Sequence, residues 1–201
     1  MKKLNLKIKE NGGMTYVEVI VVLGIFSVLS SVVLFNYGLF QAKIDIKNLS
    51  SDIALKIVEA QKLSLSGKLP PPSFPITPTW KPSYGIWINL NEENKSFFYF
   101  VDLDSDNLFD GGNCTVECLE KIIITKGNSI SSLDFFNKGD AIAHNLTNLA
   151  INFVRPNGAA ILKSTIPIDP ATVSYAQITI ISPKLDTAKI KVYSSGRIQI
   201  N

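Results

Sequence analysis

The chain has little of the chemistry on which most enzymes and zinc proteins depend. Its 201 residues include two cysteines and a single histidine. Zinc fingers and mixed Cys/His zinc sites need more ligands than these, and a catalytic triad needs a histidine with partners that the sequence does not identify. Gly-rich phosphate loops, G-x-S-x-G elbows and paired glutamates at catalytic spacing are also missing. The sequence therefore predicts no enzymatic activity, and His144 is interpreted as a surface loop residue.

Charge is scarce and unevenly distributed along the chain. Charged residues make up 18% of the sequence and hydrophobic residues 46%, a balance that excludes a wholly disordered protein. The formal net charge of +3 belongs entirely to residues 1–13, which hold four lysines and one glutamate. The rest of the chain has equal numbers of basic and acidic residues. The basic isoelectric point of the whole chain therefore comes from residues 1–13 and gives no support to a basic body that binds nucleic acid.

A long hydrophobic run follows the basic segment. Residues 19–42 are 24 consecutive residues without a charge, and thirteen of the first seventeen are large and apolar. As a helix, this run would be about 36 Å long, enough to cross a hydrocarbon layer of about 30 Å. The lysines before it place the N-terminus in the cytoplasm and the C-terminal part outside. No Ala-x-Ala-like cleavage site follows, so the run is interpreted as a single membrane span rather than a secretory signal peptide.

Glu18 lies at the start of this span, where a carboxylate costs up to about 3 kcal/mol depending on its depth. Two interpretations are open. Either the carboxylate is hydrated at the level of the lipid headgroups, or it has a partner in an assembled state.

The residues around Glu18 resemble the class III signal of type IV prepilins and type II secretion pseudoprepilins. The shared features are a lysine-rich leader, Gly13, an apolar Met14, and Glu18 as the fifth residue after the glycine, followed by an apolar helix. The resemblance implies that a membrane prepilin peptidase removes residues 1–13 and methylates the new N-terminus at Met14, and that Glu18 acts in assembly. Met14 stands where the family usually has phenylalanine. The helix lacks the proline of many major pilins, which fits a minor pilin better.

Beyond the span, the hydrophobic pattern continues as one face of a helix. Apolar residues recur at spacings of three and four, in the order Ile46, Leu49, Ile53, Ile57 and Ala60. Gly67 and the prolines after it end this pattern, so the sequence predicts a helix over residues 14–66. Its membrane half covers about residues 17–40, and its amphipathic exported half covers residues 41–66. A proline-rich linker, residues 67–83, follows.

Residues 84–201 have the pattern of an extracytoplasmic antiparallel β domain. Segments rich in aromatic and β-branched residues predict strands at 84–90, 96–101, 121–125, 148–155, 159–163, 175–181, 189–193 and 197–200. The last strands, with turns at Pro156-Asn157-Gly158 and Ser194-Ser195-Gly196, are similar to the closing strands of the GspH/FimT minor pseudopilins and minor pilins. The predicted fold class is α+β, with a long N-terminal transmembrane α-helix, the pilin spine, packed on a C-terminal antiparallel β-sheet domain.

An acidic loop follows the second predicted strand. Four aspartates, one backbone carbonyl and one amide match the ligand positions of a twelve-residue calcium loop. In the order of positions 1, 3, 5, 7, 9 and 12, they are Asp102, Asp104, Asp106, Leu108, Asp110 and Asn113.

The match to a calcium loop is incomplete at two positions. Asn107 stands at position 6 in place of glycine, but asparagine tolerates the left-handed conformation needed there. Position 12 lacks the bidentate glutamate, which weakens the site unless Glu117 or Glu120 compensates. Calcium is favoured over an ion-free acidic turn because four neighbouring carboxylates repel each other.

Cys114 and Cys118 lie in the same loop. Outside the cytoplasm they are a candidate disulfide that would stiffen the loop, although a bridge between residues four apart needs a turn-like geometry. A metal site made of two thiols is less favoured, and free thiols stay open as a third interpretation.

These features predict a minor pilin or pseudopilin. Such a subunit is stored in the cytoplasmic membrane and assembles with other pilins, through its N-terminal helix, into an extracellular or periplasmic filament. Two alternatives stay open. Lys189, Lys191 and Arg197, with Lys184 nearby, form a patch that suits weak DNA binding by a subunit of a DNA-uptake pilus. A signal-anchored surface domain with a calcium-braced loop is the other alternative.

Overall fold

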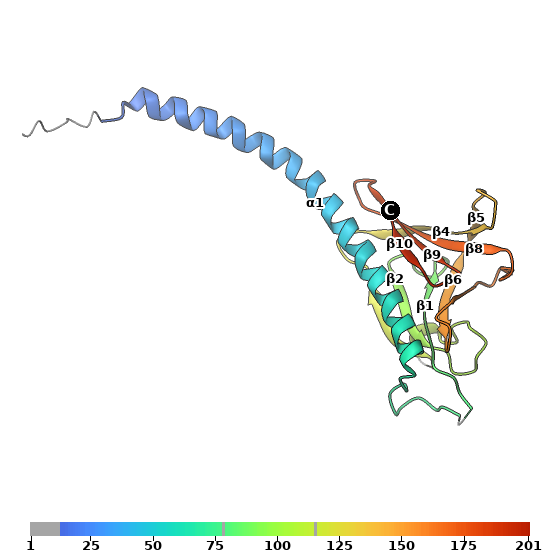
Figure 1. Cartoon of the computed structure of the whole chain (residues 1–201). Coiled ribbons are helices and arrows are strands. Elements are labelled where there is room, and N and C mark those ends of the chain that lie inside the picture. Colours follow the sequence, from blue (N-terminus) through green and yellow to red (C-terminus); the bar gives the residue numbers. More distant parts are fainter. Residues whose placement is uncertain (1–12, 78, 115) are drawn as a thin grey trace, which may run out of the picture. The chain divides into compact units, whose positions relative to one another are not determined.

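The computed structural model describes residues 13–77, 79–114 and 116–201, and the chain divides into two units, Met1–Phe40 and Gln41–Asn201. Residues 1–12 of the predicted leader lie outside the described residues. Helix α1 (Tyr16–Ser66) contributes to both units, and the described strands belong to the second (Figure 1). The α+β class, with a long apolar N-terminal helix and a C-terminal antiparallel β domain, is confirmed.

Helix α1 begins and ends at local sequence signals. At its start the Thr15 hydroxyl accepts the backbone N–H of Glu18 at 3.3 Å, which is the bond of an N-terminal cap. At its end Gly67 adopts a φ of 69°, and its N–H donates to the Ser64 carbonyl at 3.2 Å. A left-handed glycine closes the last turn in this way because it has no Cβ to clash. The helix therefore ends at Ser66, as the sequence predicts.

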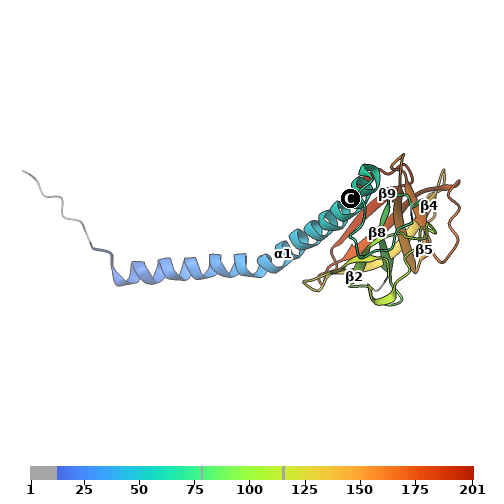
Figure 2. The ribbon, with the colours of Figure 1, turned by 90° about the horizontal axis from the view of Figure 1, so that it is seen from below.

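The C-terminal half of α1 packs against the strands of the second unit (Figures 1 and 2). The predicted apolar stripe forms this buried face. Leu49 is partly buried, and four further side chains of the stripe are at most 4% exposed, namely Ile46, Ile53, Ile57 and Ala60. Burying one isoleucine side chain contributes roughly 1.5–3 kcal/mol. A soluble fragment of the β domain must therefore begin near Gln41, at the start of the second unit, rather than after the helix.

The described strands form two antiparallel five-stranded sheets. Sheet A has the order β3-β2-β1-β6-β7, and sheet B has the order β10-β9-β8-β4-β5. The strands of sheet A are β1 (Ser83–Asn89), β2 (Ser96–Val101), β3 (Cys118–Ile123), β6 (Asn148–Val154) and β7 (Ala160–Lys163). Those of sheet B are β4 (Ser129–Asn137), β5 (His144–Leu146), β8 (Val173–Ile181), β9 (Thr187–Tyr193) and β10 (Ile198–Ile200).

One hydrophobic core joins the two sheets and the helix. Sheet A contributes Tyr84 and Ile151, sheet B contributes Ile178 and Ile190, and α1 contributes Ile57, all of them at most 1% exposed. In each strand the residues next to these point to the opposite face, because side chains alternate along a strand. Both sheets therefore have an outer face that the core does not use.

The structure differs from the sequence-based strands in sheet B and at β3. Strands β4 and β5 lie where no strand is predicted. A bulge between Ile130 and Ser132 places the buried Ile130 and Leu133 three residues apart, so β4 lacks the alternation of a regular strand. Strand β3 begins at Cys118, three residues before the predicted segment.

Candidate functional site

The N-terminal part of α1 has an apolar surface. Helix α1 is the one helix among the described residues that is long and apolar enough to cross a membrane. Large side chains on it are exposed within the first unit, including Phe26 at 66%, Leu29 at 61% and Phe35 at 84%. Gly13 and Met14 directly precede this helix, and Glu18 lies in its first turn. Within the described residues no side chain binds the Glu18 carboxylate, which is exposed.

The acidic loop brings three of its aspartates together. Carboxylate oxygens of Asp102, Asp104 and Asp106 lie within 4.8 Å of one another. Asp102 is buried, Asp104 is exposed and Asp106 is intermediate, so the cluster opens to solvent on one side. The loop is built by short side-chain bonds to its own backbone. The Asp106 N–H donates to Asp104 at 3.1 Å, and the Leu108 N–H donates to Asp106 at 2.6 Å.

Asp102 organises the start of the loop from a fully buried position. Its Oδ1 accepts the N–H of Ser105 at 2.8 Å, and its Oδ2 accepts the N–H of Asn107 at 3.2 Å. The same Oδ2 accepts bonds from the Ser83 hydroxyl at 3.1 Å and the Asn152 amide at 3.0 Å. Burial raises the pKa of Asp102, and the bond from Ser83 and the two backbone bonds offset part of this effect.

Two residues of the aspartate-containing segment 102–110 have the left-handed conformation. Asn107 has a φ of 63°, which the sequence predicts for position 6 of a calcium loop, and Ser105 has a φ of 70°. Left-handed residues turn the chain sharply, so successive aspartates converge on one point. The amine of Lys163, on β7, donates to the Asp106 carbonyl at 2.5 Å and fixes the loop to sheet A.

Glu117 is a second organiser of the loop. It is 2% exposed, and its two carboxylate oxygens accept the N–H of Leu103 at 2.7 Å and the N–H of Asp110 at 2.9 Å. Burial raises its pKa to about 7, backbone bonds oppose the rise, and the charges of Asp102 and Asp104 add to it. The sequence names Glu117 only as a substitute ligand, because nothing in the sequence shows that it is buried.

The other predicted ligands are less closely associated with the cluster. The Asp110 side chain is not part of the three-carboxylate group. The Asn113 side chain lies outside the described residues. Glu120 is directed elsewhere, since it pairs with Lys56 of α1 at 2.9 Å. The structure therefore supports Asp102, Asp104 and Asp106 as the centre of the candidate cation site.

The loop also covers the outer face of sheet A. Phe109 stacks on Phe98 with ring centres 5.0 Å apart and contacts Phe100 and Trp87 at 5.5 and 6.4 Å. Gly85 of β1 has no room for a side chain here, since a Cβ would lie 2.9 Å from the Phe100 ring and 2.5 Å from a backbone carbonyl. These rings anchor the loop by a second, apolar attachment.

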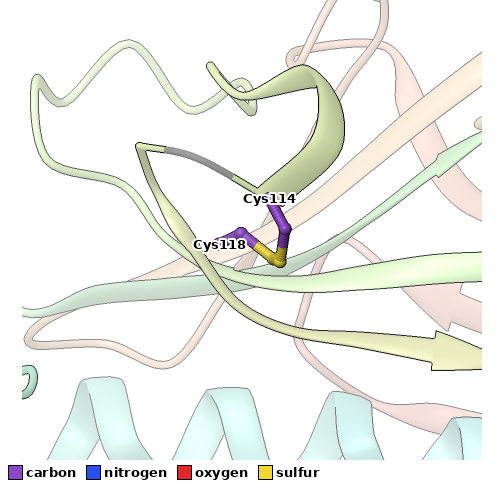
Figure 3. The surroundings of a disulfide bond; sticks show 2 residues. All are labelled: Cys114 and Cys118. Atoms are coloured by element: carbon purple, nitrogen blue, oxygen red, sulfur yellow. A yellow bond between two sulfur atoms is a disulfide. The ribbon is translucent and has the colours of Figure 1, made fainter.

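Cys114 and Cys118 form a disulfide between the 3-10 turn η1 (Gly112–Cys114) and the start of β3 (Figure 3). Their Cα atoms are 4.6 Å apart, within the range that a disulfide spans. The bridge closes the C-terminal end of the loop, next to Glu117.

The C-terminal basic residues lie on the outer face of sheet B. Lys189 and Lys191 alternate with buried residues on β9, and Arg197 directly precedes β10. Lys191 lies over the Tyr175 ring at 4.9 Å, and the Arg197 guanidinium lies over the Tyr193 ring at 3.9 Å. Two of the three cations therefore already contact aromatic rings of the same face.

The same face carries a row of stacked aromatic side chains. Phe136 stacks on Tyr175 at 4.6 Å with a 15° interplanar angle, and Tyr175 contacts Tyr193 at 5.2 Å. The contacts with one another and with the cations occupy part of the surface of these rings. The predicted position of His144 is wrong, since it lies in β5 rather than in a loop and stacks on Phe135 at 4.7 Å.

No protein-family model, curated protein or solved structure matches this chain.

Proposed function

We propose that the protein is a minor pilin or pseudopilin, a structural subunit of a type IV pilus or a type II secretion pseudopilus. A precursor is held in the cytoplasmic membrane by the first half of α1, with the N-terminus in the cytoplasm and the β domain outside. A prepilin peptidase removes residues 1–13 and methylates Met14. The subunit then joins a filament through helix-to-helix contacts with other pilins.

The observation that carries this proposal is Glu18 in the first turn of an exposed apolar helix. A helix whose large apolar side chains are exposed within their unit needs lipid or other helices around it. A simple anchor accounts for the apolar surface but gives no reason for a carboxylate without a described partner. In a filament, the amine of Met14 on a neighbouring subunit would neutralise that carboxylate as the helix leaves the lipid.

Mass spectrometry of the membrane-extracted or filament form tests the proposal directly. The expected N-terminal peptide begins at N-methyl-Met14. Mature material that keeps residues 1–13 would leave only the anchored surface domain. Gly13→Ala is the matched variant, and we expect it to accumulate as uncleaved precursor.

We further propose that the acidic loop binds Ca²⁺ through Asp102, Asp104 and Asp106, with Leu108, Asp110 and Asn113 completing the shell. Support comes from the convergence of three carboxylates within 4.8 Å on a loop with a left-handed residue at position 6. A divalent cation would also offset the charge repulsion that the buried Asp102 and Glu117 face. Bound calcium would brace the loop over sheet A.

DNA uptake remains the lower-ranked function. Lys189, Lys191 and Arg197 do share one face, but two of them already contact tyrosine rings. Three cations on one face can neutralise only a few phosphates. Such a face fits weak, salt-sensitive DNA binding.

A further inference from the structure

Three segments meet at the end of the second unit where the chain enters from the apolar run. They are the first exported turns of α1, the turn between β3 and β4, and the turn between β8 and β9. Asp45 of α1 pairs with Lys126 of the first turn at 2.6 Å. A Cβ on Gly127 of that turn would lie 2.8 Å from Pro183 of the second turn. A cavity of about 420 Å³, lined by Lys43, Lys47 and Asp186 among others, separates the helix from the second turn.

The turn between β8 and β9 presents Leu185 in an unusual way. Its side chain is 77% exposed, and its φ of 66° is a conformation that leucine rarely adopts. The turn is fixed, because the buried Ser182 hydroxyl accepts the N–H of Lys184 at 3.3 Å and the N–H of Asp186 at 3.1 Å. Glycine or asparagine would suit this backbone better, and leucine gains no burial from it. Neither turn geometry nor core packing therefore explains the leucine.

Lysines lie on all three segments that meet at this end of the unit, including the turn that carries Leu185. Lys43, Lys47 and Lys184 are exposed, and none of them has an ion pair among the described residues. Lys126 is paired with Asp45, and Asp186 is the other acid at this end. An apolar tip among unpaired lysines is the combination that binds the boundary between phosphate headgroups and acyl chains.

We propose that this end of the β unit binds the phospholipid surface of the membrane in which the precursor is stored. Lys43, Lys47 and Lys184 contact lipid phosphates, and Leu185 inserts at the headgroup boundary. The inference rests on the proposed membrane storage. Chain connectivity supports it, since Lys43 is the first charged residue after the 24 uncharged residues 19–42. That residue therefore lies at the headgroup level, and Lys47 follows one helical turn later on the same side.

The contact would hold the stored subunit in one orientation against the bilayer. It would also be released when the helix is drawn into a filament, because the lysines then leave the lipid. Each lysine near an anionic surface shifts the bound population by about fivefold. Lipid charge thus sets how firmly the β unit rests on the membrane.

A fluorescent label at position 185 tests the contact in the full chain. Leu185→Cys gives a unique labelling site, because the two cysteines of the sequence form a disulfide. The labelled protein is reconstituted in vesicles of phosphatidylcholine, with or without phosphatidylglycerol, that contain a headgroup nitroxide lipid as quencher. We expect strong quenching that increases with phosphatidylglycerol. Leu69→Cys, at a leucine that is 63% exposed beyond the other end of α1, is the label control and should stay unquenched.

Charge variants complete the experiment. The triple variant Lys43→Gln, Lys47→Gln, Lys184→Gln should lose most of the quenching at position 185. The triple variant Lys62→Gln, Lys68→Gln, Lys81→Gln removes the same charge from exposed lysines elsewhere and should keep it. Resistance to alkaline extraction reports insertion separately. Two results for an inserted chain would overturn the lipid contact and leave the pilin proposal intact. One is the absence of quenching at position 185. The other is quenching that changes neither with lipid charge nor in the first triple variant. A chain that does not insert overturns membrane storage, and with it both proposals.

Discussion

The Asn152 side-chain amide donates to Oδ2 of Asp102 at 3.0 Å, and neither residue has any exposed surface. This bond links β6, inside sheet A, to the first residue of the acidic loop. The loop is thus positioned by the sheet beneath it, and a candidate ligand is held in place before any cation arrives.

Replacing Asp102 by asparagine should destabilise the second unit. The new amide N–H₂ would face one of the donors that now bond to the carboxylate, and a buried donor would lose its acceptor. The free energy of unfolding of Gln41–Asn201 should fall by about 1–3 kcal/mol in calcium-free urea titrations. The control Asp104→Asn, at an exposed position, should change it by about 0.5 kcal/mol or less. Equal effects of the two changes would contradict the buried role of Asp102.

Calcium should raise the melting temperature of the same fragment. At ten times a dissociation constant of about 10⁻⁴ to 10⁻³ M, binding adds about 1.4 kcal/mol to stability. For a protein of this size, that corresponds to roughly 3–5 °C in a thermal scan against chelator. Asp104→Ala should abolish the difference, and Asp52→Ala on the exposed surface of α1 should preserve it. Equal melting temperatures of the unmodified fragment in both buffers would mean that the loop is an ion-free turn.

Without calcium, stability should depend on pH through Glu117. Its folded pKa of about 7 lies above its ordinary value of 4.5, so the folded state binds the proton more tightly. The stabilisation is complete below the ordinary value and is lost as the pH rises through 7. We expect the free energy of unfolding to fall by about 1–3 kcal/mol between about pH 5 and about pH 8. Glu117→Gln should flatten this dependence, and an unchanged slope in that variant would assign it to another group, with Asp102 the first candidate.

Glu18→Ala should leave the chain inserted in the membrane but reduce its incorporation into filaments. The variant removes the acceptor that a neighbouring N-terminal amine would neutralise and leaves the apolar surface intact. Sheared-filament fractions, compared with membrane fractions by immunoblot, measure the effect. Thr15→Ser keeps the helix cap and should incorporate normally. Full incorporation of the alanine variant would show that Glu18 is only an interfacial charge.

DNA binding by the fragment should be weak and should report few phosphate contacts. The slope of log affinity against log salt scales with the number of phosphates neutralised, so three cations predict a slope of about −3 or shallower. Lys189→Gln should weaken binding more than Lys138→Gln, because Lys138 lies outside the patch and donates to a backbone carbonyl. Submicromolar binding at physiological salt would promote the DNA-uptake function above the filament role.

Much of the helix and of sheet A follows from the sequence because the signals are local. Gly67 and the stripe from Ile46 to Ala60 define the end and the buried face of α1 without reference to any distant residue, while the Thr15 cap places its start two residues after the predicted one. Strands β1 and β2 combine aromatic and branched residues between polar turns. In β4, by contrast, the bulge at Ser131 and the buried Asp134 hide the pattern, since partners 48 residues away in β8 determine which side chains face inward.

The ligands of the candidate cation site can be predicted from the sequence, but the residues that hold the loop in place cannot. The spacing of Asp102, Asp104 and Asp106 is visible in the chain. The roles of Glu117 and Asn152 depend on burial and on backbone groups that the fold brings close. Nor does the sequence show that the lysines near the C-terminus are divided between a β turn and the face of sheet B.

The position of β1 in sheet A affects the order in which the chain folds during synthesis. Strand β1 pairs with β2 on one side and with β6 on the other, and β6 begins 59 residues after β1 ends. Strands β1 and β2 are therefore synthesised long before β6, the strand that pairs with the other edge of β1. Until Val154 emerges, the aromatic-rich hairpin has an open edge on the β1 side. The C-terminal half of α1 precedes every described strand in the chain and shares their core, so it is the first surface against which the inner face of the hairpin can pack.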